Sequence, residues 1–119
     1  VIASDVSGVG TARWDLAATE FGGDKGIFGY GDTGSTSSLT NLVSNVGIIA
    51  ADVSGVGTAR KVLAAASYGG DKGVFAYGDT GSSTSLKNLV SNTGVVAADV
   101  TGVGTARQHL AAAGFSFST

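Results

Sequence analysis

One nine-residue stretch occurs three times in this chain, and its spacing is the strongest constraint on the fold. Residues 5–13 and 52–60 both read DVSGVGTAR, and residues 99–107 differ only by Thr101 in place of serine. Asp5, Asp52 and Asp99 are therefore 47 residues apart. A fixed period of this length indicates an array of equivalent units. We divide the chain into a first copy (1–47), a second copy (48–94) and a partial third copy (95–119).

The composition argues against several classes of partner and site. Charged residues are 13% of the chain and the net charge is −2. No basic stripe or polybasic patch is present, so we expect neither nucleic acid nor a membrane surface as a partner. Cysteine is absent, which excludes disulfides, thiolate metal sites and cysteine nucleophiles. The composition does not indicate the cellular compartment.

Each copy is expected to contain four short strands. Twenty glycines and no proline suit short strands joined by tight turns. The expected strands of the first copy are residues 1–6, 11–21, 27–30 and 39–43. Glycine-rich turns at 7–10 and 22–26 and a polar loop at 31–38 separate them. Residues 48–53 and 95–100 are the equivalents of the first strand.

Residues 11–21 are also compatible with a helix, because Leu16 precedes two alanines. The apolar run is short, an aromatic residue follows it, and glycines flank the segment on both sides. These features favour a strand.

Four strands per unit, glycine-rich turns and this period indicate β-propeller blades. The run Thr58-Ala59-Arg60, the small residues 63–66 and the strand-like residues 71–78 resemble a kelch motif. The repeats are also similar to those of repetitive proteins of marine phages and environmental bacteria, generally of unassigned function. The resemblance implies an all-β fold of kelch-like blades, each with four antiparallel strands.

The chain holds about two and a half such blades, whereas propellers close with about four to eight. Exposed sheet edges and unpaired terminal faces favour association, so we expect closure by homo-oligomerisation. A homodimer would have composite blades made from residues 106–119 of one chain and residues 1–6 of the other. A homotrimer of six whole blades is the competing closure. A fragment of a longer array and a solenoid or fibre are further alternatives.

Three arginines and two tyrosines are the candidate ligand-binding residues. Arg13, Arg60 and Arg107 recur with the three aspartates and would line a central channel that binds anions or polar ligands. The alternative is an ion pair between blades or a hydrogen bond that orders a loop. Tyr30 and Tyr77, together with Phe28 and Phe75, alternate with small residues. This pattern indicates either an aromatic platform that binds a sugar or core residues on one face of a strand.

The remaining polar motifs favour structural roles. Asp24-Lys25 and Asp71-Lys72 suit hairpin turns better than catalysis, and residues 32–35 read as a polar loop rather than a calcium site. His109 is the only histidine. We expect no catalytic residue, no metal and no cofactor.

These patterns predict a non-enzymatic scaffold or binding module assembled from identical chains. The main alternative is a multivalent carbohydrate-binding lectin with one site per blade junction. A hydrolase using aspartate and His109 is a further alternative. Besides the chain itself, a glycan or a protein ligand is a candidate partner.

Overall fold

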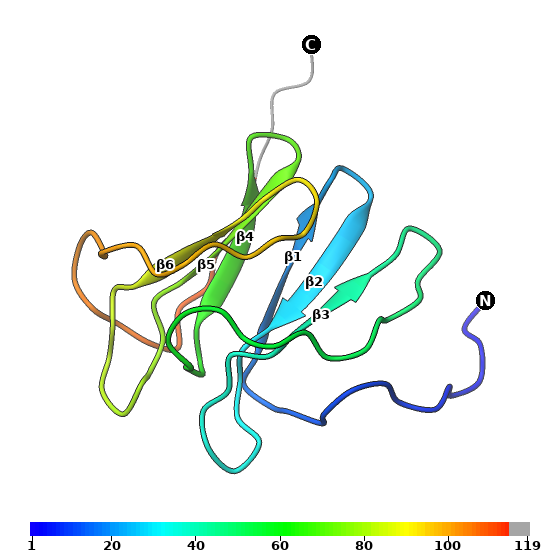
Figure 1. Cartoon of the computed structure of the whole chain (residues 1–119), viewed down its shortest axis with the longest axis horizontal. Coiled ribbons are helices and arrows are strands. Elements are labelled where there is room, and N and C mark those ends of the chain that lie inside the picture. The colour runs from blue at the N-terminus through cyan, green and yellow to red at the C-terminus, as the bar shows by residue number, and fades with distance from the viewer. Residues whose placement is uncertain (115–119) are drawn as a thin grey trace.

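Each full copy forms a three-stranded antiparallel sheet in this computed structural model, which describes residues 1–114. In the first copy the strands are β1 (Ala17–Phe21), β2 (Lys25–Gly29) and β3 (Thr40–Val43). In the second copy they are β4 (Ala64–Tyr68), β5 (Lys72–Ala76) and β6 (Lys87–Val90). The described residues form no helix, which confirms the all-β class (Figure 1).

Figure 1 shows the two sheets next to each other, with β1 and β4 at the centre. The strand orders β1-β2-β3 and β4-β5-β6 follow the chain, as in a meander.

The first hairpin of each copy closes where glycine was expected to close it. Phe21 pairs with Lys25, which leaves Gly22, Gly23 and Asp24 in the turn. Gly22 has a φ of 64° and Gly23 a φ of 84°. Only glycine adopts two consecutive left-handed conformations without steric cost, so these two glycines fix the position of the turn.

Isolated bridges replace the strands that were expected at residues 48–53 and 95–100, the equivalents of the first strand of a copy. Residues 48–53 lie antiparallel to β3, with bridges from Ile49 to Val43 and from Val53 to Thr40. Residues 95–100 lie along β6 with the equivalent bridges. Neither segment is a regular strand, so the sheets have three strands with a bridged segment at the outer edge.

Two other expected strands differ in the structure. Residues 1–6 form no strand and are exposed throughout, and they pair with no sheet edge within residues 1–114. In residues 11–21, only the end from Ala17 onward is a strand. Asp15 has a φ of 55°, which interrupts extended backbone, and Trp14 makes a single bridge to Asp32.

The hydrophobic core is a single layer between the two sheets. It is made of Phe21, Ile27, Tyr30, Leu63, Phe75, Val90 and Val96. The two sheets turn non-equivalent faces toward this layer: the face that the second sheet buries is equivalent to the face of the first sheet that points away from the layer. As a result, Phe75 is fully buried whereas its equivalent, Phe28, is 37% exposed.

Tyr30 and Phe28 do not share a face, although two residues apart in a strand they would. Tyr30 follows the end of β2 with a φ of 64°, and its ring contacts Phe75 of the next sheet at a centroid distance of 5.1 Å. The left-handed backbone at Tyr30 reverses the alternation that the sequence predicted.

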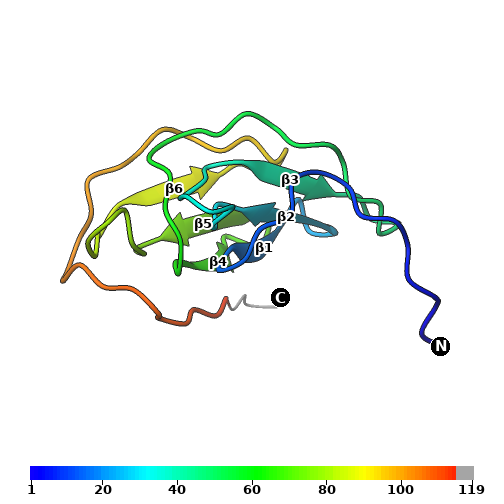
Figure 2. The ribbon, with the colours of Figure 1, turned by 90° about the horizontal axis from the view of Figure 1, so that it is seen from below.

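Equivalent segments of successive copies lie side by side. β4 packs along β1, and residues 111–112 of the third copy, the equivalents of the start of β1, line a pocket with Ala64 and Ala65 of β4. Residues 1–6 correspond to the bridged segment at the outer edge of a sheet. The connections between copies cross the same side of both sheets, and the N-terminal segment extends away from them (Figure 2).

Candidate functional site

Arg60 is the most buried of the three repeated arginines, with no exposed surface. Its Nε donates to the carbonyl of Tyr77 at 2.8 Å, and its Nη1 donates to the carbonyl of Thr58 at 3.1 Å. The guanidinium carbon lies 4.5 Å from the ring centroid of Tyr30, which belongs to the preceding copy. Arg60 therefore joins two copies through a cation–π contact and carbonyl hydrogen bonds.

Arg107 repeats the aromatic contact in the third copy. Its guanidinium lies 4.0 Å from the ring centroid of Tyr77, but the residue is exposed. The aromatic–arginine contact is thus made at both junctions between copies, at one of them in the core and at the other near solvent.

Arg13 has a different arrangement, because no aromatic ring of a preceding copy covers it. Its Nη2 donates to Oδ1 of Asn41 at 2.7 Å, and its Nη1 lies 3.7 Å from Oδ1 of Asp52. The Arg13 side chain is only 3% exposed, yet its Nε has no hydrogen-bond partner. The three arginines therefore differ in their contacts: Arg13 reaches Asn41 and Asp52, whereas Arg60 and Arg107 each lie against a tyrosine ring.

The repeated aspartates also bind the preceding copy. Asp52 accepts hydrogen bonds from the backbone nitrogen of Thr11 at 3.1 Å and from its Oγ1 at 2.7 Å. Asn41 Nδ2 donates to the same carboxylate at 2.9 Å. These hydrogen bonds, those from Thr11 first, lower the pKa of Asp52 below its usual value.

Asp99 makes the equivalent contacts one copy later. Thr58 Oγ1 donates to Asp99 Oδ2 at 2.6 Å, and Asn88 Nδ2 donates to Oδ1 at 2.9 Å. Partial burial acts to raise the pKa of Asp99, but the hydrogen bonds from Thr58 and Asn88 outweigh it and the pKa is lowered. We call the contact of each of these aspartates with its threonine the aspartate–threonine contact.

The two tyrosines are placed differently from a sugar-binding platform. Tyr30 is fully buried, and its hydroxyl donates to the carbonyl of Val56 at 3.1 Å. Burial raises its pKa. Tyr77 is half-buried and its hydroxyl donates to the carbonyl of Val103 at 3.1 Å. Each tyrosine hydroxyl thus binds a residue near the start of the following copy.

The other polar motifs make contacts within a loop or between copies. Asp32 accepts from the backbone of Gly34 at 2.7 Å and pairs with Lys61 Nζ at 2.9 Å. The ion pair with Lys61 lowers the pKa of Asp32 and raises that of Lys61. His109, with a φ of 56°, donates its backbone nitrogen to Val62. Among residues 1–114, no group of three or more acidic, histidine or cysteine side chains is placed to hold a metal ion.

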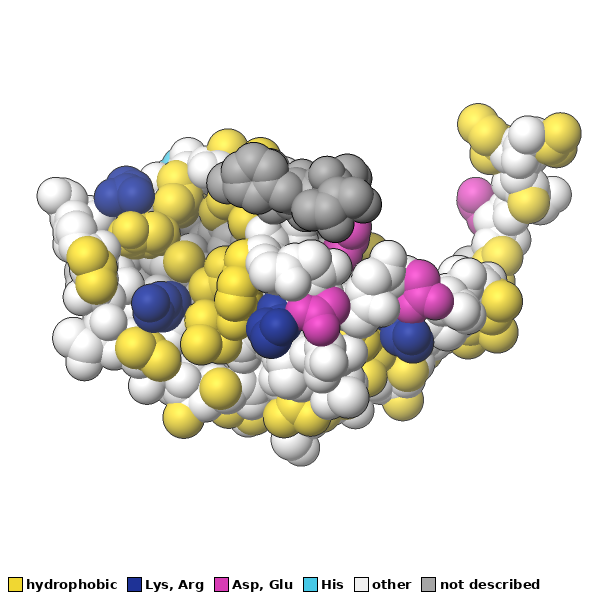
Figure 3. Space-filling model, turned by 90° about the horizontal axis from the view of Figure 1, so that it is seen from above, with side chains coloured by type: hydrophobic (Ala, Val, Ile, Leu, Met, Phe, Trp, Pro, Cys, Tyr) yellow, Lys and Arg dark blue, Asp and Glu magenta, His cyan; other side chains and the backbone are white. Residues whose placement is uncertain are grey.

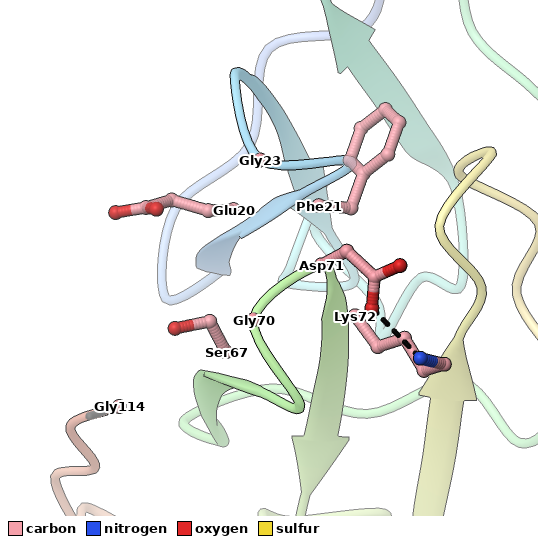
Figure 4. Close-up of a pocket in the computed structure, with 8 residues that line it drawn as sticks. All are labelled: Glu20, Phe21, Gly23, Ser67, Gly70, Asp71, Lys72 and Gly114. Carbon is pink, nitrogen blue, oxygen red and sulfur yellow. Dashed lines mark hydrogen bonds and ion pairs between the residues drawn. The ribbon is translucent and has the colours of Figure 1, made fainter. Parts of the chain in front are cut away.

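One polar pocket lies between the hairpins of the two copies (Figure 4). It measures about 330 Å³ and is lined by Glu20, Phe21, Gly23, Ser67, Gly70, Asp71, Lys72 and Gly114. Lys72 Nζ lies 2.7 Å from Asp71 Oδ1, and this pairing lowers the pKa of Asp71 and raises that of Lys72. Glu20 and Ser67 occupy the same position in successive copies, so the pocket lies where two inner strands meet.

Sequence reasoning missed Asn41 and Asn88, which are both buried. Each donates its side-chain amide to the carboxylate that completes the aspartate–threonine contact. Their recurrence at the period of 47 residues is the available signal. A buried amide that repeats with a charged residue indicates a structural hydrogen-bond network.

No family model matches the chain, and no curated protein sequence is significantly similar to it. Among the described residues, no helix is long and apolar enough to cross a membrane.

Proposed function

We propose that this chain is a non-enzymatic scaffold or binding module, in which kelch-like blades from identical chains assemble head to tail. The observation that carries the proposal is the repetition of one junction. Arg60 stacks on Tyr30 as Arg107 stacks on Tyr77, and Asp52 binds Thr11 as Asp99 binds Thr58. A contact surface that recurs between copies suits extension by further copies.

The use of the polar groups supports a structural role over catalysis. The repeated aspartates accept hydrogen bonds from backbone and amide groups of the neighbouring copy. Arg60 donates only to carbonyl oxygens. Groups engaged in this way order the junction, and catalysis would need them to face a substrate.

The strand order favours docking of whole copies over composite blades. Residues 111–114 correspond to the inner strand β1, and residues 1–6 correspond to the segment at the opposite edge of a sheet. A blade built from these two segments alone would lack the equivalents of β2 and β3. We therefore favour rings of whole copies, with four in a homodimer or six in a homotrimer.

Glycan binding through the tyrosines has less support. Tyr30 has no exposed surface, and sugar platforms need an exposed ring face. The polar pocket beside Asp71 and Lys72 is the better candidate for a small ligand of the assembled scaffold.

The solution mass of the purified chain tests the proposal, by light scattering after size exclusion and by sedimentation velocity across a range of concentrations. We expect discrete species of two or three chains that increase with concentration. A species of one chain at every concentration would contradict assembly from identical chains. Turnover in a broad hydrolase substrate screen would contradict the non-enzymatic role.

A further inference from the structure

The first copy exposes a surface whose equivalent in the second copy is buried. We call it the open face, and it surrounds a cavity of about 140 Å³ lined by Val9, Thr11, Arg13, Leu16, Phe28, Asn41 and Ile49. The equivalent residues of the second copy are Val56, Thr58, Arg60, Leu63, Phe75, Asn88 and Val96. Leu63, Phe75 and Val96 belong to the hydrophobic core and Val56 packs against it. Arg60 and Asn88 are buried as well.

The exposure of equivalent residues differs because the preceding copy covers only one of the two surfaces. Ile49 is 38% exposed, whereas its equivalent Val96 is 8% exposed. Tyr30 and Gly29 of the first copy lie against Phe75. Nothing among the described residues covers Phe28 in the same way.

Arg13 is held differently from its equivalent Arg60, because its Nη2 donates to Asn41. Its side chain is 97% buried by its neighbours, yet its Nε is unpaired. In the second copy, with Tyr30 stacked on the guanidinium, the Nε of Arg60 donates to the carbonyl of Tyr77. The equivalent acceptor for Arg13 is the carbonyl of Tyr30, which Arg13 does not reach.

The N-terminal segment lacks the partner that its equivalents have. Residues 1–10 are exposed throughout, although residues 48–53 and 95–100 each pair with a strand of the preceding sheet. Figure 3 shows this segment projecting from the body of the molecule with hydrophobic side chains at its tip. Val1 and Ile2 are among the most exposed residues of the chain.

We propose that the open face binds the second copy of another chain, and that Arg13 turns from Asn41 to stack on the ring of the partner's Tyr77. This inference rests on the proposed function and specifies its joint. The internal junctions give the contacts: Asp5 accepts from Thr58 of the partner subunit, as Asp99 does within the chain. Val6 pairs with Lys87 of the partner subunit in the way that Val100 does within one chain.

In the single chain, residues 95–107 already occupy the binding positions on the second copy. To form the joint, the N-terminal segment of the partner subunit has to displace them, so the joint is an exchange of segments. The exchange brings the sheet of the first copy, with Phe28 and the adjacent Leu16, against the partner. By contrast, most of residues 101–114 stay exposed in the single chain. The larger burial of apolar surface favours the exchange at high concentration.

One residue distinguishes the joint from the internal junction. Ala76 stands where the first copy has Gly29, and a Cβ at Gly29 would lie 2.8 Å from Cζ of Phe75. The Cβ of the partner's Ala76 therefore crowds Phe28, and the ring has to shift. We expect a reversible joint that is weaker than the internal one.

Matched substitutions in the full chain test the joint by sedimentation velocity. Arg13→Ala removes the cation under the partner's ring and should weaken association about tenfold. Arg107→Ala, at the equivalent position of the third copy, should strengthen it by a similar factor, because it loosens the segment that must leave. In a second matched pair, Val9→Asp should weaken association and Val103→Asp should strengthen it. Ala76→Gly should also strengthen association.

Trp14 is the only tryptophan, is 56% exposed, and is equivalent to Lys61, which pairs with Asp32 of the preceding copy. Its emission should therefore shift to the blue as the chains associate. Thermal unfolding monitored by circular dichroism identifies any variant that fails to fold. If the unmodified chain assembles but neither Arg13→Ala nor Val9→Asp weakens it, the joint is wrong while the scaffold proposal stands. If the unmodified chain stays at the mass of one chain, both fail.

Discussion

The guanidinium of Arg60 lies 4.5 Å from the ring centroid of Tyr30, 30 positions earlier in the chain. Both side chains are fully buried, so the contact forms part of the core between two sheets. Burial acts to lower the pKa of Arg60, but an arginine stays charged at all ordinary pH values. A permanent cation in the core is compensated by the ring and by the carbonyl oxygens around it.

Replacing Arg60 should destabilise the chain far more than replacing Arg107. We expect Arg60→Ala to lower the free energy of unfolding by about 3 kcal/mol, because it leaves a cavity and unpaired carbonyl groups. Arg107→Ala should cost less than about 1 kcal/mol, since that arginine is exposed. Urea denaturation of the two variants measures the difference, and equal losses would refute the structural role given to Arg60.

Val62 should be a site of strain. Its φ is 47°, a conformation that costs a β-branched residue about 1–2 kcal/mol. Asp15 has the equivalent conformation at 55°, which aspartate tolerates better. We expect Val62→Asn to raise the free energy of unfolding by about 1 kcal/mol and Asp15→Val to lower it by a similar amount, both measured by urea denaturation.

Gly29 should not accept a side chain. An added Cβ would lie 2.8 Å from the buried ring of Phe75, so Gly29→Ala should cost about 1–3 kcal/mol through overpacking. Gly26→Ala is the matched control, because its Cβ would find the nearest atom at 3.6 Å. Similar thermal midpoints for the two variants would show that the sheets are further apart than described.

Acid should weaken the junctions between copies. The pKa values of Asp52 and Asp99 are lower in the folded chain than the value of about 3.9 in an unfolded chain. The stability that they contribute is therefore present above about pH 5 and is lost as the pH falls through their folded values. Urea midpoints between pH 7 and pH 2.5 should fall, and less steeply in Asp52→Asn.

Asp5→Asn is the control for the acid experiment. Among the described residues Asp5 makes no hydrogen bond, so this variant should keep the acid profile of the unmodified chain at concentrations where the chains do not associate. A flattened profile for Asp5→Asn under those conditions would mean that the N-terminal segment docks within its own chain.

Local sequence patterns predicted the hairpins. The rest of the fold was harder to predict, because it depends on contacts between residues far apart in the sequence. Paired glycines at 22 and 23 located a turn, and the hydrophobic pattern from Ile27 located a strand. The side taken by Tyr30 depended on a left-handed backbone that propensities do not favour for tyrosine. Residues 1–6 have strand-like composition, but a strand also needs an edge to pair with.

For the site, repetition identified the residues but not their partners. Arg60 and Asp52 stand out by period alone, and a bond between blades or within a loop was one of two readings. That Asp52 binds Thr11, 41 residues earlier, became visible only in three dimensions. The buried role of Asn41 follows from the same contact.

The aspartate–threonine contact also means that the structural unit is out of phase with the sequence repeat. A unit that runs from Thr11 to Asp52 is fastened by residues from two successive copies, so no copy is complete by itself. Duplication of any 47-residue window would therefore lengthen the array by one unit and leave both of its ends unchanged. Such a chain can vary in length between generations without having to evolve a new contact.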